Sequence, residues 1–95
     1  MRIWFIYIKK SYDPEYPEGH VIVSPKLDPY AYKGEEKVME VANVKTGEVK
    51  KVAKVVGLGY ADFRDEEDYK QRIWDVIRKK LEEVGIKVGE EGEGK

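Results

Sequence analysis

The sequence predicts a small α+β domain, in which a mostly antiparallel sheet or small barrel of four to five strands packs against one C-terminal amphipathic helix. Three observations predict this class. Residues 3–8 are an unbroken run of β-branched and aromatic residues, and a Thr-Gly pair at 46–47 joins two further stretches rich in valine. Apolar residues then recur at three- and four-residue steps across residues 65–84. The 95 residues fit one domain, which we assign to residues 1–88.

Each strand has its own signal. The run at 3–8 lacks polar alternation, which predicts a strand buried on both faces near the middle of the sheet. Residues 20–24 predict a second, short strand between two loops rich in proline and tyrosine. Residues 36–44 and 48–56 predict a hairpin, and imperfect alternation in its second arm predicts a bulge near residues 50–51.

The sequence around residues 57–59, Gly-Leu-Gly, predicts the end of that second arm. A helix follows over residues 65–84, with Asp65 as its N-cap, and Gly85 predicts a left-handed stop after which Ile86 folds back onto the last turn. Residues 86–88 are a candidate for one more edge strand. Residues 89–95 are only glycine, glutamate and lysine, which predicts a disordered tail.

Composition narrows the chemistry. The chain has no cysteine, which excludes disulfides, thiolate nucleophiles and cysteine-ligated zinc. Charged residues make up 39% of the chain, and neutral polar residues are scarce, a bias typical of proteins from hot environments such as those of thermophilic archaea. The run at residues 3–8 is far too short to span a bilayer and lacks a signal-peptide cleavage region. We therefore expect a cytoplasmic protein without a membrane association, either a monomer or a homodimer.

Charge is distributed unevenly along the chain. Residues 1–61 carry ten Lys or Arg against eight Asp or Glu, whereas residues 62–95 carry eight against eleven. The predicted sheet is therefore mildly basic and rich in aromatic residues, and the helical half is acidic. This composition suits a sheet that faces nucleic acid, and it equally suits an ordinary β core.

Two groups of residues are candidates for a nucleic-acid-binding site. Lysines on and beside the hairpin would contact phosphates, and tyrosines in the loops would stack on bases. The candidates are Lys33, Lys45, Lys50, Lys51, Lys54, Tyr30 and Tyr32. The alternative for the lysines is a solvated hairpin edge, and the alternative for the loop tyrosines, which also include Tyr12 and Tyr16, is that they pin their loops onto the sheet.

Catalytic and metal-binding interpretations have weaker support. His20 is the only histidine, and no serine lies in a nucleophile-elbow sequence, so we predict no catalytic residues. The acids near His20 are interpreted as a solvated loop, and the acidic cluster from Asp62 to Asp68 as helix capping, so no metal or cofactor is predicted. The glycines at 57 and 59 lack the rest of a phosphate-binding fingerprint.

Four stretches between residues 32 and 68 follow one order. Residues 32–38 contain the run Gly-Glu-Glu-Lys-Val, which is similar to a Gly-acid-x-Val entry to a strand. Residues 44–49 form the hairpin, residues 52–56 the next strand and residues 60–65 its run into an acidic helix start. This order resembles ASCH domains of the PUA-like superfamily, which are small β-barrels associated with RNA binding and, in some members, with modified-nucleoside chemistry. The resemblance implies a barrel and an RNA-facing surface.

The chain departs from that family in its N-terminal half. Such domains carry a Gly-x-Lys-x-x-Glu-x-Arg element there, and this sequence has no such run. No catalytic role is therefore carried over. The sequence predicts a non-enzymatic module that binds RNA or other single-stranded nucleic acid, and the alternative is a protein-interaction or regulatory module, of viral or mobile-element origin, without nucleic-acid binding.

Overall fold

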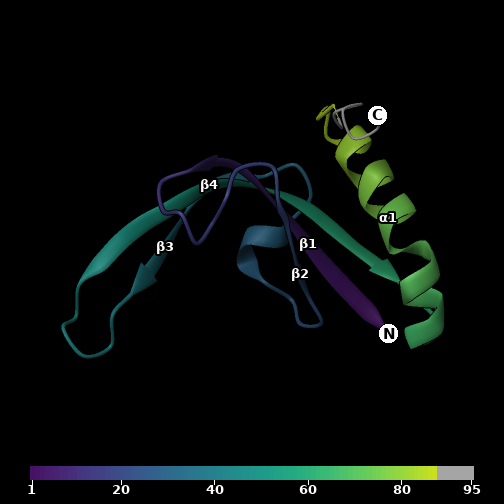
Figure 1. Ribbon diagram of the computed structural model, residues 1–95, viewed down its shortest axis with the longest axis horizontal. Helices are drawn as coiled ribbons and strands as arrows, with labels where there is room; N and C mark the ends of the chain where they lie inside the picture. The colour runs from purple at the N-terminus through teal and green to yellow at the C-terminus, as the bar shows by residue number, and fades with distance from the viewer. Residues whose placement is uncertain (88–95) are drawn as a thin grey trace.

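The computed structural model of the chain describes residues 1–87 and consists of one four-stranded antiparallel sheet and one long helix (Figure 1). The elements in chain order are β1 (Arg2–Ser11), β2 (Val21–Ser24), the short 3₁₀ helix η1 (Pro29–Ala31), β3 (Glu36–Ala42), β4 (Val49–Asp62) and α1 (Glu66–Glu83). The strand order is β2-β1-β4-β3. The sheet arches strongly, with η1 beneath the arch and α1 outside one end of it. The predicted α+β class is confirmed, with an open sheet whose edges, among the described residues, are β2 and β3.

Strand β1 is central and buried on both faces, as its sequence predicts. It pairs with β2 on one side and with β4 on the other. Its side chains alternate between two hydrophobic clusters, with Ile6 and Ile8 under the arch and Ile3 and Phe5 on the side of α1. The apolar run at residues 3–8 of β1 is stable only where both faces are covered, and here η1 covers one face while α1 covers the other.

The two clusters form the core of the molecule. The cluster under the arch joins the sheet to η1 through buried Ile6, Ile8, Ala31, Met39, Val52, Ala53 and Val55. The cluster on the other side joins the sheet to α1 through buried Ile3, Phe5, Leu58, Phe63 and Leu81. The helix contributes Leu81 directly and packs Ile73, Val76 and Ile77 around it, which is the apolar stripe that the sequence predicts.

The predicted hairpin is present. Strands β3 and β4 pair in register from Glu36 opposite Val56 to Ala42 opposite Val49, and Gly47 in the connecting turn has a φ of 76°. The register shifts where Met39 pairs with Ala53 and Glu40 pairs with Lys51. The extra residue is Val52, so the bulge lies next to the predicted position.

The prediction that Gly-Leu-Gly at 57–59 ends the strand is wrong. Strand β4 continues through both glycines to Asp62, because β1 pairs with it along this whole length. The register shifts again here, with Phe5 opposite Gly59 and Ile6 opposite Gly57. Leu58 is the extra residue, and its side chain is fully buried beneath α1. The glycines therefore allow a bulge within a strand instead of an exit from it.

The helix begins and ends as its sequence predicts. The Asp65 carboxylate accepts a hydrogen bond from the N–H of Asp68 at 2.9 Å, which caps the N-terminus. At the other end Gly85 has a φ of 81°, and the N–H of Ile86 donates to the carbonyl of Leu81 at 2.9 Å. Ile86 packs on the cluster beneath α1, so the chain does fold back onto the last turn.

The remaining predictions concern the C-terminus and membranes. Ile86 and Lys87 lie in no strand, and Val88 and the predicted tail at residues 89–95 lie outside the described residues. No helix in residues 1–87 combines the length and apolar character that crossing a bilayer requires.

Candidate nucleic-acid interface

The last part of strand β4, from Gly57 to Asp62, extends beyond the edge strand β3. Strand β3 pairs with β4 only as far as Val56, so from Gly57 onwards no strand within residues 1–87 pairs with β4 on that side. Residues 32–35 occupy the first part of this edge. The N–H of Gly34 donates to the carbonyl of Gly57 at 2.9 Å, and the N–H of Gly57 donates to the carbonyl of Glu35 at 2.9 Å.

Gly57 allows this close approach. A Cβ atom at position 57 would overlap the backbone carbonyl of Tyr32 and contact the carbonyl carbon of Ala31. Only glycine leaves room for one backbone to lie directly against another here. The contact fixes where Tyr32 and Lys33 leave η1, and it holds both residues beside the last part of β4.

An aromatic pair lies in the same part of the sheet. Trp4 of β1 and Tyr60 of β4 are cross-strand partners, and their ring centroids lie 4.9 Å apart with an interplanar angle of 53°. The guanidinium carbon of Arg2 lies 4.0 Å from the centroid of the Tyr60 ring. Tyr60 still exposes 40% of its surface, although it is packed from two sides.

These residues line a surface groove of 450 Å³. The groove contains three aromatic and two basic side chains, and its lining residues are Trp4, Tyr32, Lys33, Gly59, Tyr60 and Lys80. They come from β1, β4, α1 and the segment after η1. Tyr32 exposes 44% of its surface, so two tyrosine rings are accessible in one groove beside two lysines.

Ion pairs at the rim hold the basic groups in place. The Lys33 ammonium lies 2.8 Å from a Glu83 carboxylate oxygen, and hydrogen bonding to Lys33 lowers the pKa of Glu83 below its ordinary value, with Lys80 adding to the effect. Arg2 binds Asp62 through two nitrogens at 2.9 and 3.3 Å, and this hydrogen bonding lowers the pKa of Asp62. The carboxylates therefore stay ionised, and they offset part of the positive charge.

The structure does not gather the predicted lysines on one face. Lys50 pairs with Asp13 at 2.8 Å, and Lys54 pairs with Glu36 at 3.3 Å. Lys50 and Lys51 are consecutive residues of a regular part of β4, so their side chains point to opposite faces of the sheet. Lys45 lies in the hairpin turn, at the far end of the molecule from α1 (Figure 1). Of the five predicted lysines, only Lys33 lines the aromatic groove.

Two of the loop tyrosines anchor their loops to the sheet, and the other two are exposed, as base stacking requires. Tyr16 and Tyr30 pack against the cluster beneath the arch, and the Tyr30 hydroxyl accepts a hydrogen bond from the N–H of Glu40 at 3.4 Å. These two pin their loops onto the sheet. Tyr12 and Tyr32 are exposed, and Tyr32 is the one that lines the groove.

Four of the six groove residues were not among the predicted site residues, and three of these four carry a side chain that could contact a ligand: Trp4, Tyr60 and Lys80. Trp4 lies in an unbroken apolar run, which gives no sign of which face is open. Tyr60 joins Trp4 only through the register of two strands that are far apart in sequence, and Lys80 lies on the helix. The position of Tyr60 directly after the glycine pair at 57 and 59 is the one local signal, and it carries no chemistry by itself.

The acidic residues near the start of α1 and the single histidine form no catalytic or metal-binding cluster within residues 1–87. Asp62 pairs with Arg2, Asp65 caps the helix, and the Asp68 carboxylate accepts hydrogen bonds from the N–H of Arg64 and from Arg72, both at 2.9 Å. His20 is exposed, with Nδ1 3.5 Å from the carbonyl oxygen of Glu18. In residues 1–87, no three His, Asp or Glu side chains gather as metal ligands would.

Comparison of the chain with protein-family models, with curated proteins and with solved structures finds no match. The resemblance to ASCH domains over residues 32–68 therefore stays a prediction.

Proposed function

We propose that the chain binds single-stranded nucleic acid, RNA in particular, in the groove between β4, residues 32–33 and α1. The observation that carries the proposal is the pairing of two accessible tyrosine rings, Tyr32 and Tyr60, with the ammonium groups of Lys33 and Lys80 in one groove. Every base has a flat face that stacks on an aromatic ring, and every nucleotide carries a phosphate.

The division of roles follows from exposure and charge. Contacts with Trp4 and Arg2 hold the Tyr60 ring in place while 40% of its surface stays exposed, so it offers a base a rigid platform at little cost in side-chain entropy. Within the described residues Lys80 has no carboxylate within ion-pairing distance, so it is available to a phosphate. When nucleic acid binds, Lys33 gives up its ion pair with Glu83 to contact a phosphate, and this exchange reduces the net contribution of Lys33 to the binding free energy.

The balance of charge favours single strands over duplex DNA. Few cations line the groove, and carboxylates compete for some of them, so stacking carries more of the affinity than counterion release does. Stacking requires unpaired bases. With two to three phosphate contacts, the logarithm of the binding constant should fall with the logarithm of the salt concentration with a slope of about −1.4 to −2.1.

Fluorescence anisotropy tests the proposal with labelled single-stranded RNA, single-stranded DNA and duplex DNA at two salt concentrations. Replacing Tyr60 or Tyr32 with leucine should weaken RNA binding by about 1–3 kcal/mol, because one stacked base is lost while the apolar volume remains. Lys80→Ala should reduce the salt slope by about 0.7.

Tyr12→Leu is the matched control, since Tyr12 is an exposed tyrosine that does not line the groove. It should bind as the unaltered chain does. Unaltered affinity in both Tyr60→Leu and Tyr32→Leu would contradict the proposed site. If Lys45, Lys50 and Lys51 then prove necessary, binding occurs on the hairpin, and absence of binding to all three probes refutes the function.

A further inference from the structure

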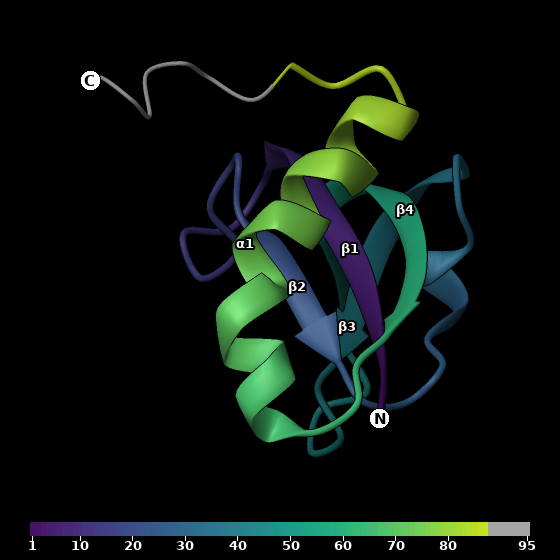
Figure 2. The ribbon, with the colours of Figure 1, turned by 90° about the vertical axis from the view of Figure 1, so that its right-hand side faces the viewer.

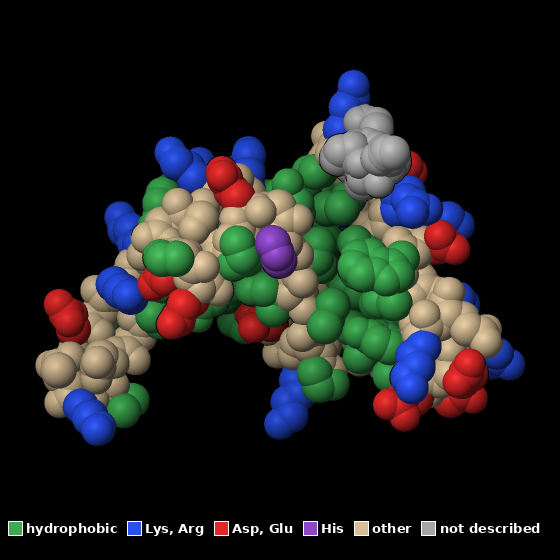
Figure 3. Space-filling view, viewed as in Figure 1, with side chains coloured by type: hydrophobic (Ala, Val, Ile, Leu, Met, Phe, Trp, Pro, Cys, Tyr) green, Lys and Arg blue, Asp and Glu red, His purple; other side chains and the backbone are tan. Residues whose placement is uncertain are grey.

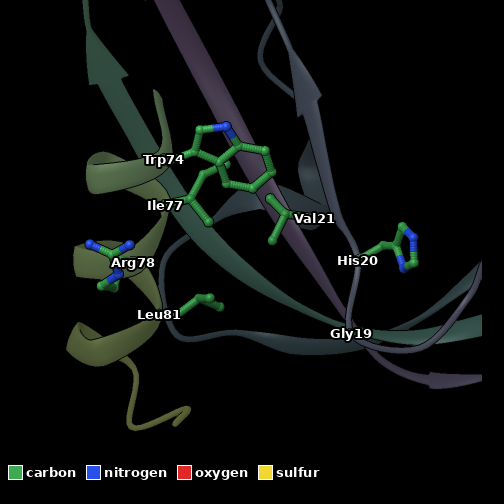
Figure 4. Close-up of a pocket in the computed structure, with 7 residues that line it drawn as sticks. All are labelled: Gly19, His20, Val21, Trp74, Ile77, Arg78 and Leu81. Carbon is green, nitrogen blue, oxygen red and sulfur yellow. The ribbon is translucent and has the colours of Figure 1, made fainter. Parts of the chain in front are cut away.

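A second groove, separate from the aromatic one, runs between α1 and the edge strand β2. Its volume is 390 Å³, and its lining residues are Gly19, His20, Val21, Trp74, Ile77, Arg78 and Leu81. In Figure 4 Trp74 and Ile77 extend from the helix toward Val21 on the strand. Apolar side chains also gather in Figure 3 between the single histidine and the helix. Trp74 is 72% exposed, an unusual state for the largest apolar side chain of a helix.

The edge of β2 has unpaired backbone groups beside this groove. The N–H of Ile8 donates to the carbonyl of His20 at 2.9 Å, so the His20 carbonyl faces β1. Backbone direction alternates along a strand, and Ile22 therefore also faces β1. The N–H and carbonyl groups of Val21 and Val23 consequently point outward from the sheet, where a further strand would bind them.

The two edges of the sheet differ in their protection. Strand β3, at one edge, carries Glu36, Lys37 and Glu40 among its seven residues. Such charges prevent an edge strand from pairing with another chain. Strand β2, Val-Ile-Val-Ser, carries neither charge nor proline. The unprotected edge is the one that lies beside the apolar groove.

The helix limits what fits against this edge. Figure 2 shows the N-terminal half of α1 extending past β2 on the outer side of the sheet. A second copy that paired antiparallel through its own β2 would bring its own α1 to the same side of the sheet, into the space that this overhang occupies. A bare peptide strand carries no such layer and fits beneath the helix.

The charge of the groove indicates which side chains a bound segment should carry. Arg78 is the one permanently charged residue that lines the groove, and no carboxylate of the described chain lines it. Arg78 pairs with Asp75 at 3.2 Å, but both side chains are more than half exposed, so a bound carboxylate competes readily for the guanidinium.

We propose that this groove binds an extended peptide segment of a protein partner, which adds to the sheet beside β2, buries alternate apolar side chains against Trp74 and Ile77, and directs an acidic side chain to Arg78. The N–H and carbonyl groups of Val21 and Val23 supply the main-chain hydrogen bonds, and the groove selects the side chains.

Panning the full chain against a library of short random linear peptides tests this. We expect enriched peptides to share alternate apolar residues and one acidic residue, and to slow hydrogen exchange at the amides of Val21 and Val23. Val23→Pro should weaken binding at least tenfold. It removes an N–H that the fold itself does not use, and proline is tolerated at an outward-facing edge position.

Two side-chain variants test the contribution of the groove to peptide binding separately from that of the strand edge. Trp74→Ala should also weaken binding at least tenfold, and Arg78→Glu should reverse the preference to peptides that carry lysine in place of the acid. Tyr12→Leu and Tyr60→Leu are the controls and should retain full peptide binding. Thermal unfolding followed by circular dichroism checks that each variant is folded.

Three results would overturn the inference. The first is that no peptide is enriched. The second is that enriched peptides bind Val23→Pro and Trp74→Ala as well as they bind the unaltered chain. The third is sedimentation of the chain as a dimer that either variant converts to a monomer, which would identify a second copy as the occupant.

Discussion

Replacing Gly57 with alanine should destabilise the protein more than the same replacement at Gly59, two residues away. At position 57 the added Cβ overlaps the backbone of Tyr32 and Ala31, so residues 31–35 must move away from β4. That movement breaks the two hydrogen bonds that join Gly57 to Gly34 and Glu35. Each bond is worth about 1 kcal/mol net. Withdrawing the fully buried Ala31 methyl group from its cluster adds roughly 1 kcal/mol.

The expected loss for Gly57→Ala is therefore about 3 kcal/mol in the free energy of unfolding. Gly59 differs because its added Cβ meets only the side chain of Lys33, at 3.5 Å, and the strain comes from its φ of 83°. An alanine in that left-handed conformation costs roughly 1 kcal/mol. Urea unfolding followed by circular dichroism measures both losses, and the difference of about 2 kcal/mol between the two variants is well within its precision.

The same two variants also test whether RNA binding depends on the backbone contact at Gly57. Because Gly57→Ala displaces Tyr32 and Lys33, it should weaken RNA binding at temperatures where the variant is still folded, whereas Gly59→Ala should affect binding less. A stability loss for Gly57→Ala no larger than that for Gly59→Ala would refute the reasoning, since it would mean that residues 31–35 do not depend on contact with β4.

Two further predictions concern the core around α1. Asp68→Asn should destabilise the protein at neutral pH, because hydrogen bonding from the N–H of Arg64, and then from Arg72, lowers the pKa of this 5% exposed carboxyl below its ordinary 3.8. A carboxyl whose pKa is lower in the folded state stabilises the protein above its unfolded pKa and loses that contribution as the pH falls through the folded pKa. Urea midpoints of the two proteins should therefore converge well below pH 3.8, and a constant difference would contradict the assignment. Leu58→Ala should cost about 2–5 kcal/mol, since it leaves a cavity beneath the helix, whereas Leu27→Ala, at a 55% exposed position, should change stability by less than about 0.5 kcal/mol. Equal urea midpoints for these two variants would show that the bulge does not anchor α1.

Local patterns in the sequence determined the elements of this protein. The boundaries of α1 follow from Asp65 and Gly85, because a cap is a contact between residues a few positions apart. The hairpin follows from Gly47, and the double-sided burial of β1 follows from its unbroken apolar run. In each case the decisive interaction lies within one element or one turn, where sequence spacing and spatial distance coincide.

Only the tertiary structure decided how far β4 extends and where side chains meet. The glycines at 57 and 59 have the composition of a strand end, but pairing with β1 continues past them, and no local pattern records that pairing. The aromatic groove likewise depends on the register that sets Tyr60 opposite Trp4, and on the backbone contact at Gly57 that brings Tyr32 and Lys33 beside them. The hairpin lysines, close together in sequence, separate because consecutive residues of a strand point to opposite faces.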